Sequence, residues 1–221
     1  MSINNFWLRF LGFAGVLGGV ILFAGDMLFY YDSHSIDILT NMGNVSDLRI
    51  VISGVCALVA AWLYMIGLGQ VYYAFRSTGS VARNIVLICF AGILIGYGVV
   101  HAAYVAIATT AKLSVQNGLN ISDATMLALK TNNLLRMLIY PLFAILSYLF
   151  IIKVWNRETV YPRWIIFFFP LLPFLLKGFI IGVFSGSARL VVSGGFLNLI
   201  LMIFFLASTV ALWNSGSGKD K

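Results

Sequence analysis

The sequence predicts an all-α, polytopic membrane protein with six transmembrane helices in one bundle. Of its 221 residues, 61% are hydrophobic and 10% are charged, whereas a soluble domain carries about 25% charged residues. Apolar runs recur along the chain, and a run of roughly 20 residues crosses the hydrocarbon core of a bilayer. The net charge is +7, but the basic residues are scattered between these runs, which argues against a nucleic-acid-binding protein.

The six predicted spans form one domain over residues 1–214, at about 7–30, 50–75, 84–110, 132–153, 163–184 and 190–213. The first span resembles a signal peptide in position, but it is long and has no good cleavage site. Gly12, Gly15, Gly19 and Asp26 also lie within about 60° of one another on a helix. Such a stripe indicates packing against other helices.

The third span contains a polar face. Tyr97, His101 and Tyr104 share that face in the third span, while Gly92 and Gly96 lie on a different side. Glycines suit close helix packing, so the tyrosine and histidine face is predicted to line a pocket or a polar seam.

The fourth span carries a second polar stripe. Asn132, Arg136, Tyr140 and Ser147 line up within about 80° on a helix that is otherwise hydrophobic. Arg136 near the end of the span is predicted either to face this seam or to reach the outer headgroups.

The fifth span contains Pro170 and Pro173, which remove two backbone donors one to two turns before Lys177. A loosened helix that carries a buried lysine makes room for a ligand. The sixth span contains two polar residues, Asn198 and Ser208. Residues 215–221 are predicted to be a flexible tail.

The basic residues outside the spans or at their ends predict the orientation of the bundle. One side of the membrane receives eight of them, and the other side receives four: Arg49, Lys112, Lys130 and Arg189. Because cytoplasmic segments carry the excess of lysine and arginine, both termini are predicted to be cytoplasmic.

Four ionisable residues fall within spans, where they are costly and are functional candidates. Asp26, His101, Arg136 and Lys177 all lie in the outer half of the bilayer at a rise of about 1.5 Å per residue. An alternative is structural: Asp26 could pair with Arg136 or Lys177 and so fix the register of the helices.

No catalytic or cofactor motif accompanies these residues, and we predict no metal and no cofactor. The chain has no P-loop, no HExxH and no CxxC. Cys56 and Cys89 lie in apolar runs, and the two histidines, His34 and His101, are too few for a metal or haem site.

The predicted function is an outer-leaflet pocket that binds a small amphiphilic or anionic ligand such as a lipid. Asp26 and His101 are the catalytic candidates, because a carboxyl and an imidazole can transfer protons. The candidate ligand-binding residues are Tyr30, Tyr97, Tyr104, Arg136, Tyr140 and Lys177. The alternatives are a small proton-coupled transporter that uses Asp26 and His101, and a structural membrane subunit. The sequence leaves open whether the protein is an enzyme and whether it forms a homo-oligomer.

Two stretches carry a resemblance to a known family. Residues 25–32 (GDMLFYYD) and 53–64 (SGVCALVAAWLY) are similar to those of an uncharacterised family of small bacterial six-helix membrane proteins. The resemblance implies a bacterial cytoplasmic (inner) membrane and the same number of spans. It implies no activity.

Overall fold

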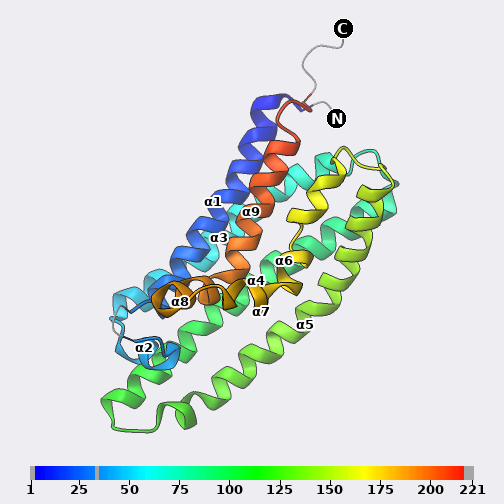
Figure 1. Cartoon of the computed structure of the whole chain (residues 1–221). Coiled ribbons are helices and arrows are strands. Elements are labelled where there is room, and N and C mark those ends of the chain that lie inside the picture. The colour runs from blue at the N-terminus through cyan, green and yellow to red at the C-terminus, as the bar shows by residue number, and fades with distance from the viewer. Residues whose placement is uncertain (1–2, 33–34, 217–221) are drawn as a thin grey trace.

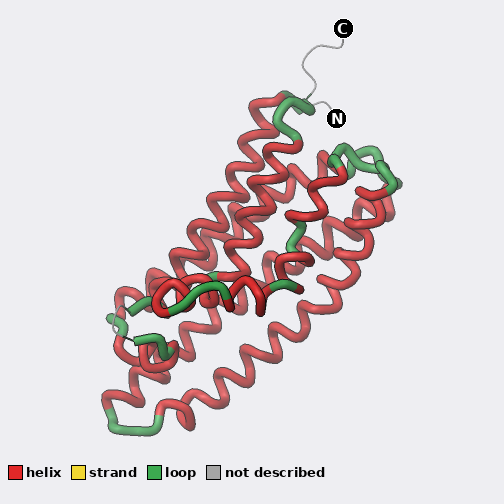
Figure 2. Tube along the Cα trace, viewed as in Figure 1, coloured by secondary structure: helices red, strands yellow, loops and turns green. Residues whose placement is uncertain are grey.

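The computed structural model describes residues 3–32 and 35–216, and this part of the chain is all-α. His34 and the end of the predicted tail, 217–221, lie outside the described residues. Short loops join the helices (Figure 2). In chain order the elements are α1 (Asn5–Tyr30), α2 (Ile38–Asn44), α3 (Asp47–Ala74), α4 (Ser80–Gln116), α5 (Ile121–Trp155), the 3-10 helix η1 (Arg163–Phe168), α6 (Leu171–Leu175), α7 (Lys177–Gly182), α8 (Gly186–Gly194) and α9 (Phe196–Ala211) (Figure 1).

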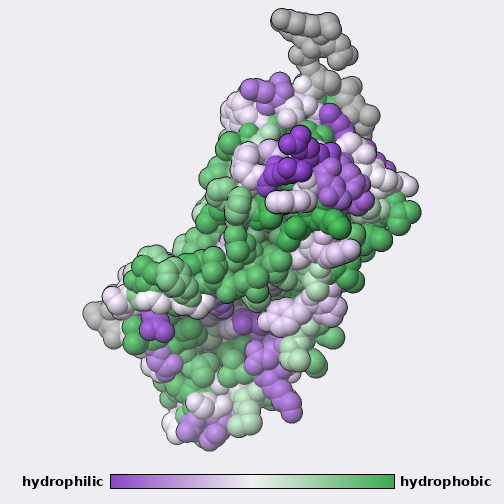
Figure 3. Space-filling model, turned by 45° about the vertical axis from the view of Figure 1, so that its right-hand side comes forward, coloured by the Kyte–Doolittle hydropathy of each residue, from purple (hydrophilic) through white to green (hydrophobic). Residues whose placement is uncertain are grey.

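Four of these helices, α1, α3, α4 and α5, are long and apolar enough to cross a membrane. The pair α8 and α9 makes a fifth candidate, although it is bent by 68° at its break. A broad hydrophobic surface covers the middle of the molecule, with hydrophilic residues gathered near its ends (Figure 3). The chain therefore has the features of a multi-pass membrane protein.

The longest two helices extend past the others at one end of the bundle (Figure 1). α4 has 37 residues and α5 has 35, so each is about 50–55 Å long at the rise of an α-helix. Gly118, at φ +64°, lies in the turn between them, a conformation that costs glycine little. Each of the two helices is therefore longer than the hydrocarbon core of a bilayer, which is about 30 Å thick.

The apolar stretch 163–184 is one predicted span, but the structure divides it among η1, α6 and α7. Pro170 has no backbone N–H and disfavours helical geometry at the residue before it. Phe169 is accordingly extended, at φ −66° and ψ 138°. None of the residues of α6 or α7 is buried, and α7 and α8 lie across the bundle (Figure 1).

The central packing brings α1, α3 and α9 together through glycines. A Cβ added at Gly67 would lie 2.7 Å from Gly15 Cα, and one added at Gly15 would lie 2.4 Å from the Phe205 ring. These helices can approach closely because both positions lack a side chain. Phe205 then stacks on Tyr64, with 5.8 Å between the ring centroids.

A buried polar network ties the same helices together near the termini. Gln70 donates to the Leu8 carbonyl at 3.1 Å and accepts from Ser208 Oγ at 2.6 Å. Because the Ser208 hydroxyl donates its one proton to Gln70, the Tyr161 hydroxyl, 2.6 Å away, donates to Ser208 Oγ. Every group in this network has a partner, which marks it as structural.

The start of α1 and the segment that follows α9 meet beside this network. Arg9 Nε donates to the Trp213 carbonyl at 3.1 Å, and the start of α1 lies beside the end of α9 (Figure 1).

Candidate functional site

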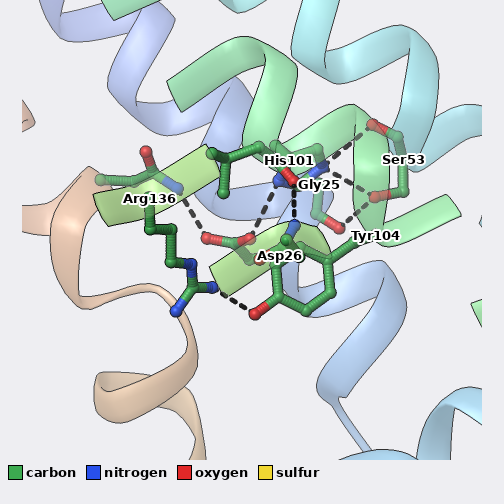
Figure 4. A network of polar contacts seen from close by, with 9 residues as sticks. Gly25, Asp26, Ser53, His101, Tyr104 and Arg136 are labelled. Carbon is green, nitrogen blue, oxygen red and sulfur yellow. Dashed lines mark hydrogen bonds and ion pairs between the residues drawn. The ribbon is translucent and has the colours of Figure 1, made fainter. Parts of the chain in front are cut away.

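The centre of the candidate site is a contact between α1 and α4. His101 Nδ1 lies 3.0 Å from Asp26 Oδ1, and Asn198 of α9 donates to Asp26 Oδ2 at 2.6 Å (Figure 4). The approach depends on Gly25, because a Cβ there would lie 3.1 Å from His101 Nε2 and 2.9 Å from Cys56 Cβ. Asp26 and His101 are both buried.

The hydrogen bonds around the imidazole determine where its protons lie. Ser53 Oγ donates its proton to the Gly25 carbonyl at 2.7 Å, so towards His101 Nε2, 3.0 Å away, it accepts. The Ser53 carbonyl, 3.1 Å from the same nitrogen, can only accept. Nε2 is therefore protonated, and a second proton lies between Nδ1 and the Asp26 carboxyl. The Asp26–His101 pair carries no net charge, whichever of the two holds that proton.

Ser53, His101 and Asp26 have the connectivity of a catalytic triad, but their environment does not suit nucleophilic catalysis. The Ser53 side chain is 0% exposed and its hydroxyl donates to a carbonyl instead of to the imidazole. A triad serine donates to its histidine and faces the substrate. Ser53 therefore orients the ring of His101.

A cavity of about 80 Å³ opens beside this pair. It is lined by α1, α4, α5, α7, α8 and α9, and Figure 3 shows hydrophilic residues set into a hollow of the hydrophobic surface. The structure brings seven of the eight candidate residues to this one cavity: Asp26, Tyr30, Tyr97, His101, Tyr104, Arg136 and Lys177.

Tyr140 is the candidate that does not line the cavity. Its side chain is 49% exposed, and its ring lies 6.3 Å from that of Phe174. It shares a helical stripe with Arg136, but one turn of α5 carries it past the cavity towards α6.

The two cations of the cavity have no carboxylate partner among the described residues. Arg136 donates to the Tyr104 hydroxyl, and its buried Nε has no partner. Lys177 Nζ lies 5.7 Å from the centre of the Phe196 ring and makes no hydrogen bond within the described part of the chain. The alternative in which Asp26 pairs directly with Arg136 or Lys177 is not the arrangement of the structure. Among the described residues the ion-pair partner of Asp26 is His101, and Asn198 donates to its other carboxyl oxygen.

The comparisons with known proteins place the chain in a family. Residues 1–215 match a family model described as "Family of unknown function (DUF6796)". The chain belongs to this family. No curated protein and no solved structure matches it. The membership supports the resemblance to an uncharacterised family and extends it over nearly the whole chain.

Sequence reasoning did not assign two residues of this family member's site. Asn198 holds the carboxyl of Asp26, and Ser53 holds the imidazole of His101. An asparagine within an apolar span is costly without a partner, and this was the available signal for Asn198. Ser53 carried no signal, because serine is common in membrane helices and satisfies itself on the backbone.

The chemistry of the site follows from its charges. A neutral pair and two cations leave positive charge in a partly desolvated cavity, which favours an anion. Within the described residues no group of three or more His, Cys, Asp or Glu side chains could hold a metal ion. Binding of an anion is the chemistry that these side chains support.

Proposed function

We propose that this protein binds the anionic group of a small amphiphile, such as a lipid, in the cavity beside Asp26 and His101. The observation that carries the proposal is the pair of cations, Arg136 and Lys177, that face one cavity without an anionic partner in the described chain. Two like charges in a partly buried site repel each other, and a bound phosphate or carboxylate would offset that cost.

The size of the cavity limits which part of the ligand it receives. Sites for whole small molecules measure about 300–1,000 Å³, whereas this cavity has about 80 Å³. It suits a headgroup. An adjoining hollow of about 290 Å³ shares Ser193 with the cavity. It is lined by the apolar side chains of Ile36, Ile38, Phe184 and Leu190, with Ser185, Gly186 and Arg189 beside them. We propose that this hollow takes the apolar body of the ligand.

The membrane topology is part of the proposal. We infer six crossings: α1, α3, α4, α5, the broken segment η1–α6, and α9. From Arg136 to Trp155 the rise along α5 is about 28 Å, so these residues would lie at opposite boundaries of the hydrocarbon core. From the distribution of basic residues we infer that both termini are cytoplasmic and that the cavity lies in the outer leaflet. A bacterial inner membrane remains our prediction from the family resemblance.

The proton held between Asp26 and His101 favours a second candidate function, a proton-coupled carrier of the same anion. Loss of that proton would put a negative charge beside the anion and weaken its binding. An uptake assay in proteoliposomes tests this candidate. A pH gradient should drive anion uptake in the wild type and not in Asp26→Asn.

The main proposal is tested by the thermal stability of the purified protein with octyl phosphate or with octyl glucoside. We expect octyl phosphate to raise the melting temperature, and Arg136→Gln and Lys177→Met to lose the increase. Lys130→Met removes the same charge from an exposed position outside the cavity and should keep it. Equal stabilisation by the neutral octyl glucoside, or loss of the increase in Lys130→Met, would overturn the proposal.

A further inference from the structure

A second apolar groove lies on α5, at the end of the helix away from the cavity. Its volume is about 560 Å³. A single continuous stripe of α5 forms most of the groove, and Leu171 of α6 closes one side. The lining residues from α5 are Ala144, Ser147, Tyr148, Ile151, Ile152 and Trp155.

The groove exists because the proline-broken segment covers one part of α5 and leaves the rest open. Phe169 stacks on Phe150 at 4.2 Å and on Phe143 at 6.4 Å between ring centroids. The chain then turns away into α6, which has five residues. η1 has six residues and α6 has five, so this segment is much shorter than α5 (Figure 1).

The length of the groove matches one leaflet of a bilayer. From Ala144 to Trp155 the rise is about 16 Å, and half of the hydrocarbon core is about 15 Å. An apolar stripe of this length in a membrane helix suits an acyl chain that lies along α5.

The end of the groove at Trp155 presents a fixed cation. Arg163 Nε donates to the Trp155 carbonyl at 2.8 Å, and its guanidinium carbon lies 5.1 Å from the Trp155 ring centre. The Arg163 side chain makes no other hydrogen bond within the described residues, so its two terminal amino groups can bind a phosphate. Lys153 differs, because Glu158 already holds its ammonium at 2.6 Å.

We propose that this groove is a binding site for an anionic phospholipid of the leaflet on the side of the termini. One acyl chain lies along the stripe from Ala144 to Trp155, and the phosphate binds the terminal amino groups of Arg163. The inference rests on the proposed membrane topology but not on the proposed ligand of the cavity, because no residue of the groove lines the cavity.

The test is lipid binding to the delipidated full-length protein, measured by native mass spectrometry. Phosphatidylglycerol and phosphatidylcholine are titrated separately. We expect the wild type to bind one phosphatidylglycerol about 10-fold more tightly than phosphatidylcholine, as one charge-assisted contact warrants. Arg163→Gln should lose this preference. Arg76→Gln, at a basic residue that stacks on Tyr73 instead, should keep it.

Two further variants separate an acyl chain from other occupants. Ala144→Trp fills the groove from an exposed position and should release both lipids, while the thermal unfolding of the protein reports that it is folded. Ser147 Oγ is buried and has no partner, so Ser147→Ala should leave lipid binding unchanged. Loss of binding in Ser147→Ala would indicate a polar ligand and overturn the proposal. So would equal affinity for both lipids in the wild type, or a dimer that Ala144→Trp disrupts.

Discussion

Asp26 Oδ1 and His101 Nδ1 lie 3.0 Å apart, although 75 residues separate them in the chain. The contact joins α1 to α4 in the buried part of the bundle, and it leaves the neighbouring Arg136 and Lys177 without that carboxylate as a partner. Because Asp26 pairs with His101, the positive charges of Arg136 and Lys177 remain in the cavity.

The Asp26 and His101 side chains should be energetically coupled in their contributions to the free energy of unfolding. Asp26→Asn and His101→Gln each leave the other side chain with a mismatched partner in a buried site, so each should lower the free energy of unfolding. The double variant should be more stable than the sum of the two changes by about 1–3 kcal/mol. The measurement is unfolding by sodium dodecyl sulfate in mixed micelles. As a control, Asp26→Asn is combined with Thr131→Ala, a distant exposed change whose effect on the free energy of unfolding should simply add. If the effects of Asp26→Asn and His101→Gln also add, the Asp26–His101 contact is not a specific interaction.

The imidazole of His101 should be protonated at Nε2 at neutral pH, because Ser53 presents two acceptors to that nitrogen. In a His34→Asn variant His101 is the remaining histidine. Its ¹⁵N NMR spectrum should show a proton bonded directly to Nε2. In Ser53→Ala the proton should stay on Nε2, which still donates to the backbone carbonyl of residue 53. An unprotonated Nε2 would contradict the assignment.

Close packing of α1 on α3 should make Gly67 intolerant of a side chain. A Cβ there meets the backbone of Gly15 at 2.7 Å, which cannot move aside cheaply. Gly67→Ala should therefore destabilise the protein by about 1–3 kcal/mol. Gly182→Ala is the matched control, because nothing lies within 4 Å of an added Cβ. The same unfolding assay decides, and equal effects of the two changes would refute close packing as the cause.

The hydroxyl of Tyr104 should matter for anion binding, since it holds Arg136 at the cavity. Tyr104→Phe should weaken the affinity for octyl phosphate about 5-fold, which corresponds to roughly 1 kcal/mol. Tyr140 lies on the stripe of α5 that carries Arg136, but outside the cavity. Tyr140→Phe should therefore bind octyl phosphate as the wild type does. Isothermal titration calorimetry gives both affinities. Loss of affinity in Tyr140→Phe would place the ligand elsewhere.

Glu158 should titrate below its ordinary range, because Lys153 donates a hydrogen bond to its carboxylate and so lowers its pKa. A lowered folded-state pKa means that the ion pair stabilises the loop above the unfolded value near 4.5. That contribution is lost as the pH falls through the folded-state pKa.

Glu158 is the one glutamate in the sequence, so selective ¹³C labelling yields a single carboxyl signal for its titration. Lys153→Met should move the midpoint upward. A midpoint that is the same in both proteins would show that the ion pair is absent in solution.

The sequence predicted well where three of the long apolar helices lie, because the length and hydrophobicity of a segment are local properties of the chain. α1, α3 and α4 contain the predicted spans 7–30, 50–75 and 84–110 to within one residue. Pro170 and Pro173 predicted a weakened helix in 163–184, and this stretch is broken in the structure. Pro141, in contrast, lies inside α5 without breaking it. Whether a proline interrupts a helix depends on what can pack against the freed backbone, and that is a tertiary property.

The site shows the same division. Helical periodicity alone put Tyr97, His101 and Tyr104 on one face and turned Asp26 inward, since these relations hold within a single helix. The partner of Asp26 depended on which helix faces α1 at that depth. Only the tertiary structure decided this, because it brought His101 and Asn198 to the carboxyl and left Arg136 and Lys177 to the cavity.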